Sequence, residues 1–121
     1  MANTFKVKTN DAMPGTAGDL TTGVLYTTPG TATNTKAIVL GLILCNVHTS
    51  QVTVSVQLVS NTSDTETNAN VYLLKDVPVP AGSSLEVLAG NKVVLQGTDV
   101  LRVDCSVSAK IDATLSIMEI T

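Results

Sequence analysis

Histidine, cysteine and aromatic residues, from which catalytic and ligand sites are often built, are scarce in this sequence. Its 121 residues include one histidine, two cysteines, two tyrosines, one phenylalanine and no tryptophan. Because His48 is the single histidine, it cannot form a metal-binding histidine set or a histidine pair. The aspartates and glutamates lack the convergent basic partner that general acid–base catalysis needs. We therefore expect no enzyme activity, no metal and no cofactor.

Charge is also scarce, at 14% of the residues, and the net charge is −3. Soluble surfaces are usually a quarter or more charged, so this deficit predicts that another molecule covers part of the surface. Nucleic-acid binding depends on clustered lysine and arginine, whereas the seven basic residues here are scattered. The apolar run Ala37–Cys45 is far shorter than the about 20 residues of a membrane-spanning helix. We expect neither nucleic acid nor membrane as a partner.

The first residues, MANTFKVKTNDAMPGTAGD, lack the basic segment and apolar core of a secretory signal. We therefore expect the chain to stay in the compartment where it is made. In a reducing cytosol Cys45 and Cys105 would be buried free thiols. A disulfide between neighbouring strands is the alternative.

Alternation between apolar and polar residues is abundant. In VTVSVQL, which begins at Val52, every second residue is apolar, the pattern of a half-buried strand. Similar segments predict about nine strands and no helix. The expected strands are Phe5–Thr9, Gly23–Thr28, Ala37–Cys45, Val52–Leu58, Val71–Val77, Ser84–Leu88, Lys92–Gln96, Leu101–Val107 and Ile111–Ile117. This series indicates an all-β fold, an antiparallel β-sandwich or jelly roll. We expect one domain, with an N-terminal arm and edge strands in residues 1–36 and the sandwich core in residues 37–121.

The run Ala37–Cys45 differs from the other strands because both of its faces are apolar. In a regular strand, one face would carry Ile38, Leu40, Leu42 and Leu44. The opposite face would carry Val39, Gly41, Ile43 and Cys45. A sandwich buries one face of each sheet, so the second face predicts a subunit interface formed by Val39, Gly41, Ile43 and Cys45. The alternative is that the chain's own N-terminal arm covers this face.

The N-terminal third is rich in glycine, threonine and proline and lacks a clear period. We interpret it as an arm that binds a larger scaffold, through Phe5, Lys6, Val7, Lys8, Leu20, Val24 and Tyr26. The segment Ser60–Asn70 is polar throughout and predicts an exposed loop tip with Asp64 and Glu66. These two carboxylates lack the spacing of a calcium loop, so solvation explains them best.

The second half of the chain resembles a pattern found in small virion proteins of tailed phages. Three segments carry the resemblance, in this order: VPVPAGSSLEVL, NKVVLQGTDVLRV and DATLSIMEI. The upstream segment AIVLGLILCNVHTSQVTVSVQLV is similar to the central hairpin of such proteins. The resemblance implies an accessory β-sandwich component of a virus particle.

From these observations we expect a non-enzymatic phage structural protein located in the virion and assembled in the host cytoplasm. The expected role is a capsid decoration or cement protein that forms a homo-oligomer, a trimer, and binds the major capsid protein. One alternative is a neck, tail or fibre-attachment component that contacts other tail proteins or a host receptor. A second alternative is a soluble sandwich module that binds carbohydrate or a small ligand, which the scarcity of aromatic residues disfavours.

Overall fold

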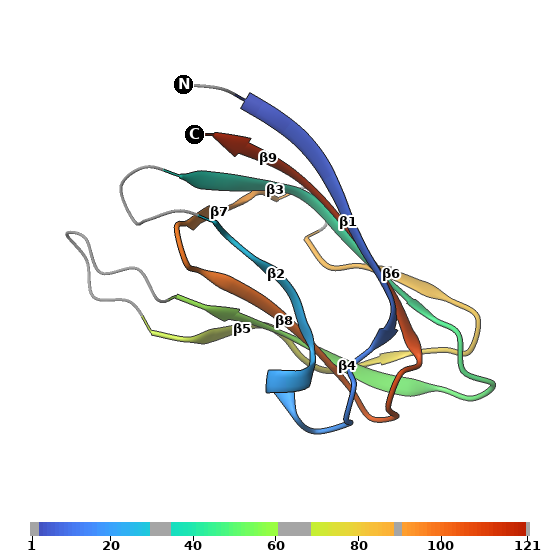
Figure 1. Ribbon diagram of the computed structural model, residues 1–121. Coiled ribbons are helices and arrows are strands. Elements are labelled where there is room, and N and C mark those ends of the chain that lie inside the picture. Colours follow the sequence, from blue (N-terminus) through green and yellow to red (C-terminus); the bar gives the residue numbers. More distant parts are fainter. Residues whose placement is uncertain (1–2, 30–34, 61–68, 89–90, 121) are drawn as a thin grey trace.

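The computed structural model describes residues 3–29, 35–60, 69–88 and 91–120, and these form two facing β-sheets (Figure 1). Nine strands lie in this described part of the chain. They are β1 (Asn3–Met13), β2 (Val24–Thr27), β3 (Lys36–Asn46), β4 (Val52–Val59), β5 (Val71–Val79), β6 (Ser84–Glu86), β7 (Val93–Gln96), β8 (Val100–Cys105) and β9 (Ile111–Ile120). One short 3-10 helix, η1 (Leu20–Thr22), precedes β2 and was not predicted. The expectation of an all-β antiparallel sandwich is confirmed.

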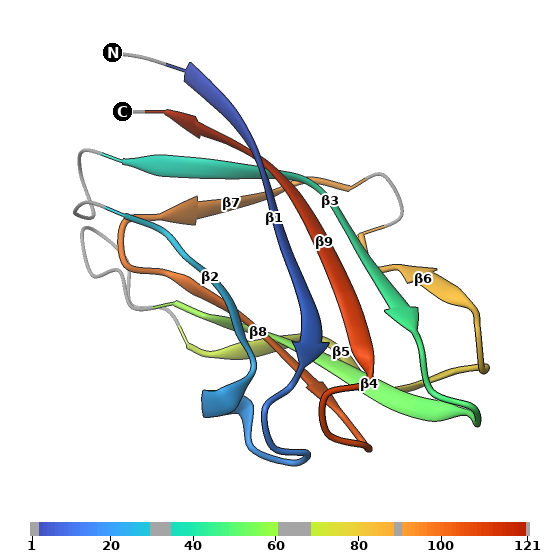
Figure 2. The same cartoon turned by 45° about the vertical axis from the view of Figure 1, so that its right-hand side comes forward.

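The order of the strands is that of a jelly roll. Sheet A has the order β1-β9-β3-β6, and β7 pairs with another part of β3 along the same edge. Sheet B has the order β2-β8-β4-β5. The chain passes from one sheet to the other at most connections, and the pairs between strands are antiparallel. The N- and C-terminal strands therefore lie side by side in sheet A (Figure 2).

The hydrophobic core lies between the two sheets. Alternate residues of β4 and β9, among them Val54, Val56, Leu115 and Ile117, have no exposed surface. Burying each such side chain stabilises the fold by about 1.5–3 kcal/mol relative to leaving it in water. The alternation predicted from the sequence is thus confirmed for these two strands.

Strand β3 departs from the predicted pattern because it contains a β-bulge at Leu40. Val39 pairs with Ile117, but Gly41 pairs with the next residue of β9, Ser116, so Leu40 is an extra residue. A bulge shifts the alternation by one residue. As a result Val39 and Leu42 both point into the core, and the predicted grouping of two regular faces is wrong. Val39 is only 1% exposed and does not belong to an outer surface.

The first 36 residues contribute edge strands to both sheets, and the part of this region that the structure describes contains no separate arm. Strand β1 pairs with β9 continuously from Asn3 opposite Ile120 to Asn10 opposite Ala113. Strand β2 pairs with β8 at the edge of sheet B. This pairing makes β1 an edge strand of sheet A. The sequence predicted an arm together with edge strands in this region, and the described residues form the edge strands.

Both cysteines are free thiols, with Cys45 partly exposed on β3 and Cys105 buried on β8. Within the described residues, no helix has the length and apolar character needed to cross a bilayer.

Candidate functional site

The outer face of sheet A, which points away from the core, is the main candidate for a functional surface. Its outward residues follow from the register and from the burial of their neighbours along each strand. We define this outer face by Asn3, Phe5, Val7, Thr9, Lys36, Ile38, Leu40, Gly41, Ile43, Cys45, Ser84, Glu86, Val94, Gln96, Asp112, Thr114, Ser116, Met118 and Ile120. The strands that carry these residues lie next to one another in Figure 2.

An apolar row crosses the whole width of this face. Phe5 of β1 lies opposite Met118 of β9, Met118 lies opposite Ile38 of β3, and Ile38 lies opposite Val94 of β7. Phe5 is 72% exposed and Val94 is 57% exposed. Four large apolar side chains thus form one continuous strip that the chain itself leaves uncovered at both ends.

Further exposed apolar residues extend this strip along the strands. Val7 is 63% exposed and lies next to Ser116, which in turn pairs with Gly41. Leu40 in the bulge and Ile43 beyond it are also exposed. Contiguous exposed apolar surface of this kind is typical of a surface that binds another molecule.

The centre of the outer face of sheet B is polar. Its central outward residues are Thr53, Ser55 and Gln57 of β4 and Arg102 and Asp104 of β8. Exposed apolar side chains lie only at the two edges of this described face, with Val24 opposite Arg102 and Tyr72 opposite Gln57. Ser55 lies directly opposite Asp104, and Gln57 lies opposite Arg102. This face has the alternation of a sheet exposed to water on one side. The two outer faces of the same sandwich are therefore chemically different.

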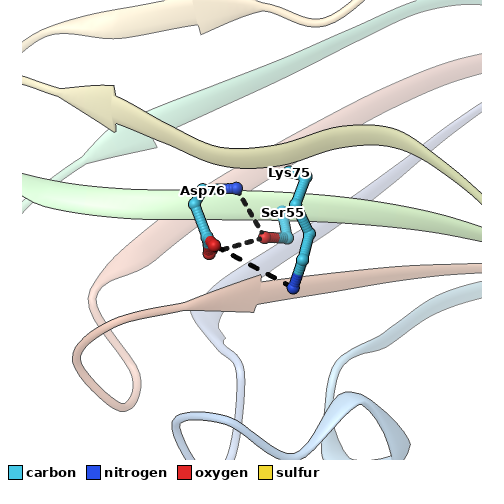
Figure 3. A network of polar contacts seen from close by, with 3 residues as sticks. All are labelled: Ser55, Lys75 and Asp76. Carbon is cyan, nitrogen blue, oxygen red and sulfur yellow. Dashed lines mark hydrogen bonds and ion pairs between the residues drawn. The ribbon is translucent and has the colours of Figure 1, made fainter.

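At the edge of sheet B, Asp76 in an irregular part of β5 contacts Ser55 of β4 (Figure 3). The backbone N–H of Asp76 donates a hydrogen bond to Oγ of Ser55 at 2.9 Å, and this hydroxyl donates to the Asp76 carboxylate at 3.4 Å. Nζ of Lys75 lies 3.9 Å from the same carboxylate. Asp76 has a positive φ of 52°, and the pairing of β4 with β5 shifts register on either side of Val56. This irregular edge is unsuited to pairing with a further strand.

A second polar cluster links the edges of the two sheets. Nζ of Lys6 on β1 lies 2.8 Å from Oε1 of Glu119 on β9, and the hydroxyl of Tyr26 on β2 donates a hydrogen bond to Oε2 of the same residue. The bond from Lys6, followed by the bond from Tyr26, lowers the pKa of Glu119. Burial, the Glu119 hydrogen bond and the Glu119 charge together raise the pKa of Tyr26. The cluster holds a mostly buried carboxylate in its ionised form.

The predicted site residues are distributed over several surfaces. Of the predicted interface, Ile43 is exposed on the outer face of sheet A, and Gly41 and Cys45 are partly exposed there, whereas Val39 is in the core. Of the predicted arm, Phe5 and Val7 are on this same outer face, and the structure places the others elsewhere: Lys6, Lys8, Leu20, Val24 and Tyr26. Tyr26 is 5% exposed, so it is not available for contact with a scaffold. Asp64 and Glu66 lie outside the described residues.

Sequence reasoning missed Ile38, Met118 and Val94 on the outer face and Glu119 inside the sandwich edge. Only Glu119 had a signal, because it occupies an inward position of an otherwise apolar alternation in β9. Across residues 3–29, 35–60, 69–88 and 91–120, no three His, Cys, Asp or Glu side chains come together in a way that could hold a metal ion.

Comparison with solved structures gives a neighbour of similar fold. No protein-family model and no curated protein matches the sequence. Among solved structures, the chain is similar to a protein of the Bacillus endospore appendages, described as a novel family of disulfide-linked pili. The similarity covers 99% of this chain and 87% of that one, with a TM-score of 0.51 and 13% sequence identity. At this identity the likeness concerns the fold alone.

Proposed function

We propose that this chain is a non-enzymatic structural subunit that assembles with copies of itself in a phage particle, as a capsid decoration or cement protein. The observation that carries the proposal is the contrast between the two outer faces of the sandwich. The face of sheet B is polar at its centre, with Val24 and Tyr72 exposed at its edges, whereas the face of sheet A exposes Phe5, Val7, Ile43 and Val94 across its width. A monomer that works alone in water would rarely keep such a surface, because it promotes association.

The sequence supports the viral setting through its resemblance to small virion proteins of tailed phages, over Val71–Ile120. The fold supports a role as a repeating subunit, since the Bacillus appendage protein that shares it belongs to a pilus. In a decoration protein, the surface left free after self-association would bind the major capsid protein. Lys8 and Val24, which are exposed outside the outer face of sheet A, are the predicted arm residues available for that contact.

Self-association is tested with a charge placed on the apolar face. Ile43→Asp would bury an unpaired carboxylate in the assembly, and an uncompensated buried charge costs several kcal/mol. We expect the dissociation constant to rise by roughly two orders of magnitude or more. The matched control is Gln57→Asp, which adds the same charge beside Arg102 on the polar face and should leave assembly unchanged. The measurement is sedimentation equilibrium of each full-length variant.

The viral role is tested separately by immunogold electron microscopy of particles made in infected cells. Labelling over the shell is the expected result for a decoration protein. Labelling at the neck or tail would replace this assignment with the neck, tail or fibre-attachment alternative. Absence of the chain from purified particles would overturn the viral role while leaving self-association to be judged by sedimentation.

A further inference from the structure

We infer that the outer face of sheet A packs against the same face of a second copy, across a twofold axis that runs perpendicular to the strands through Ser116. This inference rests on the proposed self-association and adds the identity of the surface, its symmetry and its register. The first step is to ask what could cover the face. The chain's own N-terminal segment is ruled out over residues 3–13, because it forms β1 and contributes Phe5 and Val7 to the exposed surface.

The size of the face suits a protein interface. It is four strand positions wide, and along β9 it runs from Asp112 to Ile120. With strands about 4.8 Å apart and a rise of about 3.4 Å per residue, its flat footprint is roughly 19 Å by 27 Å. Projecting side chains make the accessible surface larger than this footprint. The result approaches the about 800 Å² per partner of a standard stable interface.

The chemistry of the face selects a second copy of the same face as its occupant. Apolar surface is removed from water most effectively by other apolar surface. The other broad face of the chain, on sheet B, has Gln57, Arg102 and Asp104 at its centre, and their burial without partners would be costly. A neighbouring copy must therefore use its own sheet A face. An interface that uses the same patch on both copies has twofold symmetry.

Lys36 and Asp112, at the two ends of the face, determine the direction of the axis, and the third charged residue of the face, Glu86, lies at its β6 edge. Lys36 pairs with Ile120, four residues from Ser116 along β9. Asp112 lies four residues from Ser116 in the other direction, next to Cys45. A twofold axis through Ser116 and across the strands therefore brings Lys36 of each copy close to the partner's Asp112. An axis along β9 would instead place Asp112 directly over the partner's Asp112, which is unfavourable.

The same axis matches large side chains with small ones. The row that contains Met118 and Ile38 would face the partner's row that contains Thr114 and Ile43, because both rows are two residues from Ser116 along β9. Met118 would thus lie over a threonine and Phe5 over Thr9, while Ile38 would lie over Ile43. Complementary sizes of this kind let two sheets interdigitate at the about 10 Å spacing of packed sheets.

The symmetry is tested by cross-linking full-length protein in a Cys45→Ser background with a bifunctional maleimide that spans about 10 Å, the spacing of two packed sheets. Ser116→Cys places a thiol on the axis, where it faces its counterpart across this spacing, so the reagent should join two copies into a covalent dimer. Thr114→Cys is the matched control. It lies about 7 Å from the axis, so its counterpart is displaced by about 14 Å along the strands in addition to the sheet spacing, beyond the reach of the reagent. Absence of a Ser116→Cys dimer, or equal cross-linking of both variants, would overturn the inferred axis.

The register is tested by charge exchange. Lys36→Glu and Asp112→Lys should each weaken self-association by about 5- to 30-fold, since each creates two repulsive contacts per dimer. In the double variant Lys36→Glu, Asp112→Lys, the dissociation constant should return to within about threefold of the parent value, because each opposite-charge pair is restored with its two charges exchanged. Failure of the double variant to recover would refute the register.

The mass of the unmodified assembly separates this inference from the proposed function. An even number of copies supports both. A trimer, the number expected from the sequence, would support self-association and overturn the twofold interface. A monomer at millimolar concentration would overturn both.

Discussion

The ion pair between Lys6 and Glu119 allows a quantitative test of how edge strand β1 is fixed to the sandwich. The change is Lys6→Met, which removes the ammonium group and keeps an unbranched side chain. In the parent the two charged atoms are 2.8 Å apart, with the Lys6 side chain 47% exposed and the Glu119 side chain 7% exposed. The variant leaves Glu119 mostly buried, with the Tyr26 hydroxyl as the one side-chain donor still bonded to it in the described structure.

The magnitude depends on how far water weakens this pair. Hydrogen bonds to charged groups in the interior contribute about 1.5–3 kcal/mol, whereas exposed ion pairs contribute about 0.2–1 kcal/mol. Because Lys6 is half exposed and Glu119 is not, we expect a loss of about 1–2 kcal/mol at pH 7. Lys8→Met is the matched control. Lys8 lies two residues along β1 on the same side of the strand and lowers the pKa of Glu119 only through a weaker charge effect.

The pH dependence gives a second readout of the same contact. A carboxylate whose pKa is lowered in the folded state stabilises the fold above its unfolded pKa, and this contribution is lost as pH falls through the lowered value. In Lys6→Met the largest cause of the lowered pKa of Glu119 is removed, so this pKa is higher than in the parent. The variant should therefore lose less stability than the parent on acidification, and the difference between the two should shrink as pH falls. Urea unfolding between pH 3 and pH 7 measures both effects. If Lys6→Met and Lys8→Met agree within about 0.3 kcal/mol throughout, the reasoning is refuted.

Three further predictions concern individual positions. Gly23→Ala should lower the free energy of unfolding, measured in urea, by more than about 3 kcal/mol, because the added Cβ would overlap the Val103 carbonyl oxygen. Gly41→Ala is the control: a Cβ there meets open space, so the free energy of unfolding should change by less than about 1 kcal/mol. Tyr26→Phe should cost about 1.5–3 kcal/mol at pH 7. It should also remove the part of the alkaline destabilisation, above about pH 10, that comes from the raised pKa of this tyrosine. Leu42→Ala should lower the free energy of unfolding by about 2–5 kcal/mol, as expected for a side chain with no exposed surface.

Alternation in single strands was enough to predict much of the fold. In β9 the residues predicted to face inward, from Ile111 to Ile117, are all buried, because a half-exposed strand must keep one apolar side. Glu119 continues the same inward series and breaks the pattern. Periodicity places Glu119 inward, but the partners that stabilise its buried carboxylate, Lys6 and Tyr26, come from strands more than ninety residues away in sequence and could not be predicted from one strand.

The apolar strip on sheet A depends on pairing between distant strands, which the sequence does not show. Phe5 and Val7 were predicted to lie in an arm, and Met118 was not singled out. Only the antiparallel register of β1 with β9 and of β9 with β3 places Phe5, Met118 and Ile38 in one row. The sequence predicted that β3 has a second apolar face, but the width of that surface comes from its neighbours.

The bulge at Leu40 explains why β3 has a second apolar surface, as predicted, but with different residues from those predicted. A regular strand with both faces apolar would have to expose either the pair Ala37 and Val39 or the pair Leu42 and Leu44. The extra residue lets both pairs point into the core, where each of the four side chains is at most 1% exposed. The apolar residues that remain outside are therefore Ile38, Leu40 and Ile43, and they add to the strip provided by β1, β7 and β9. A continuous apolar run without alternation contains no signal for the position of such a bulge, so the outer face of this strand could be predicted to exist, but not its composition.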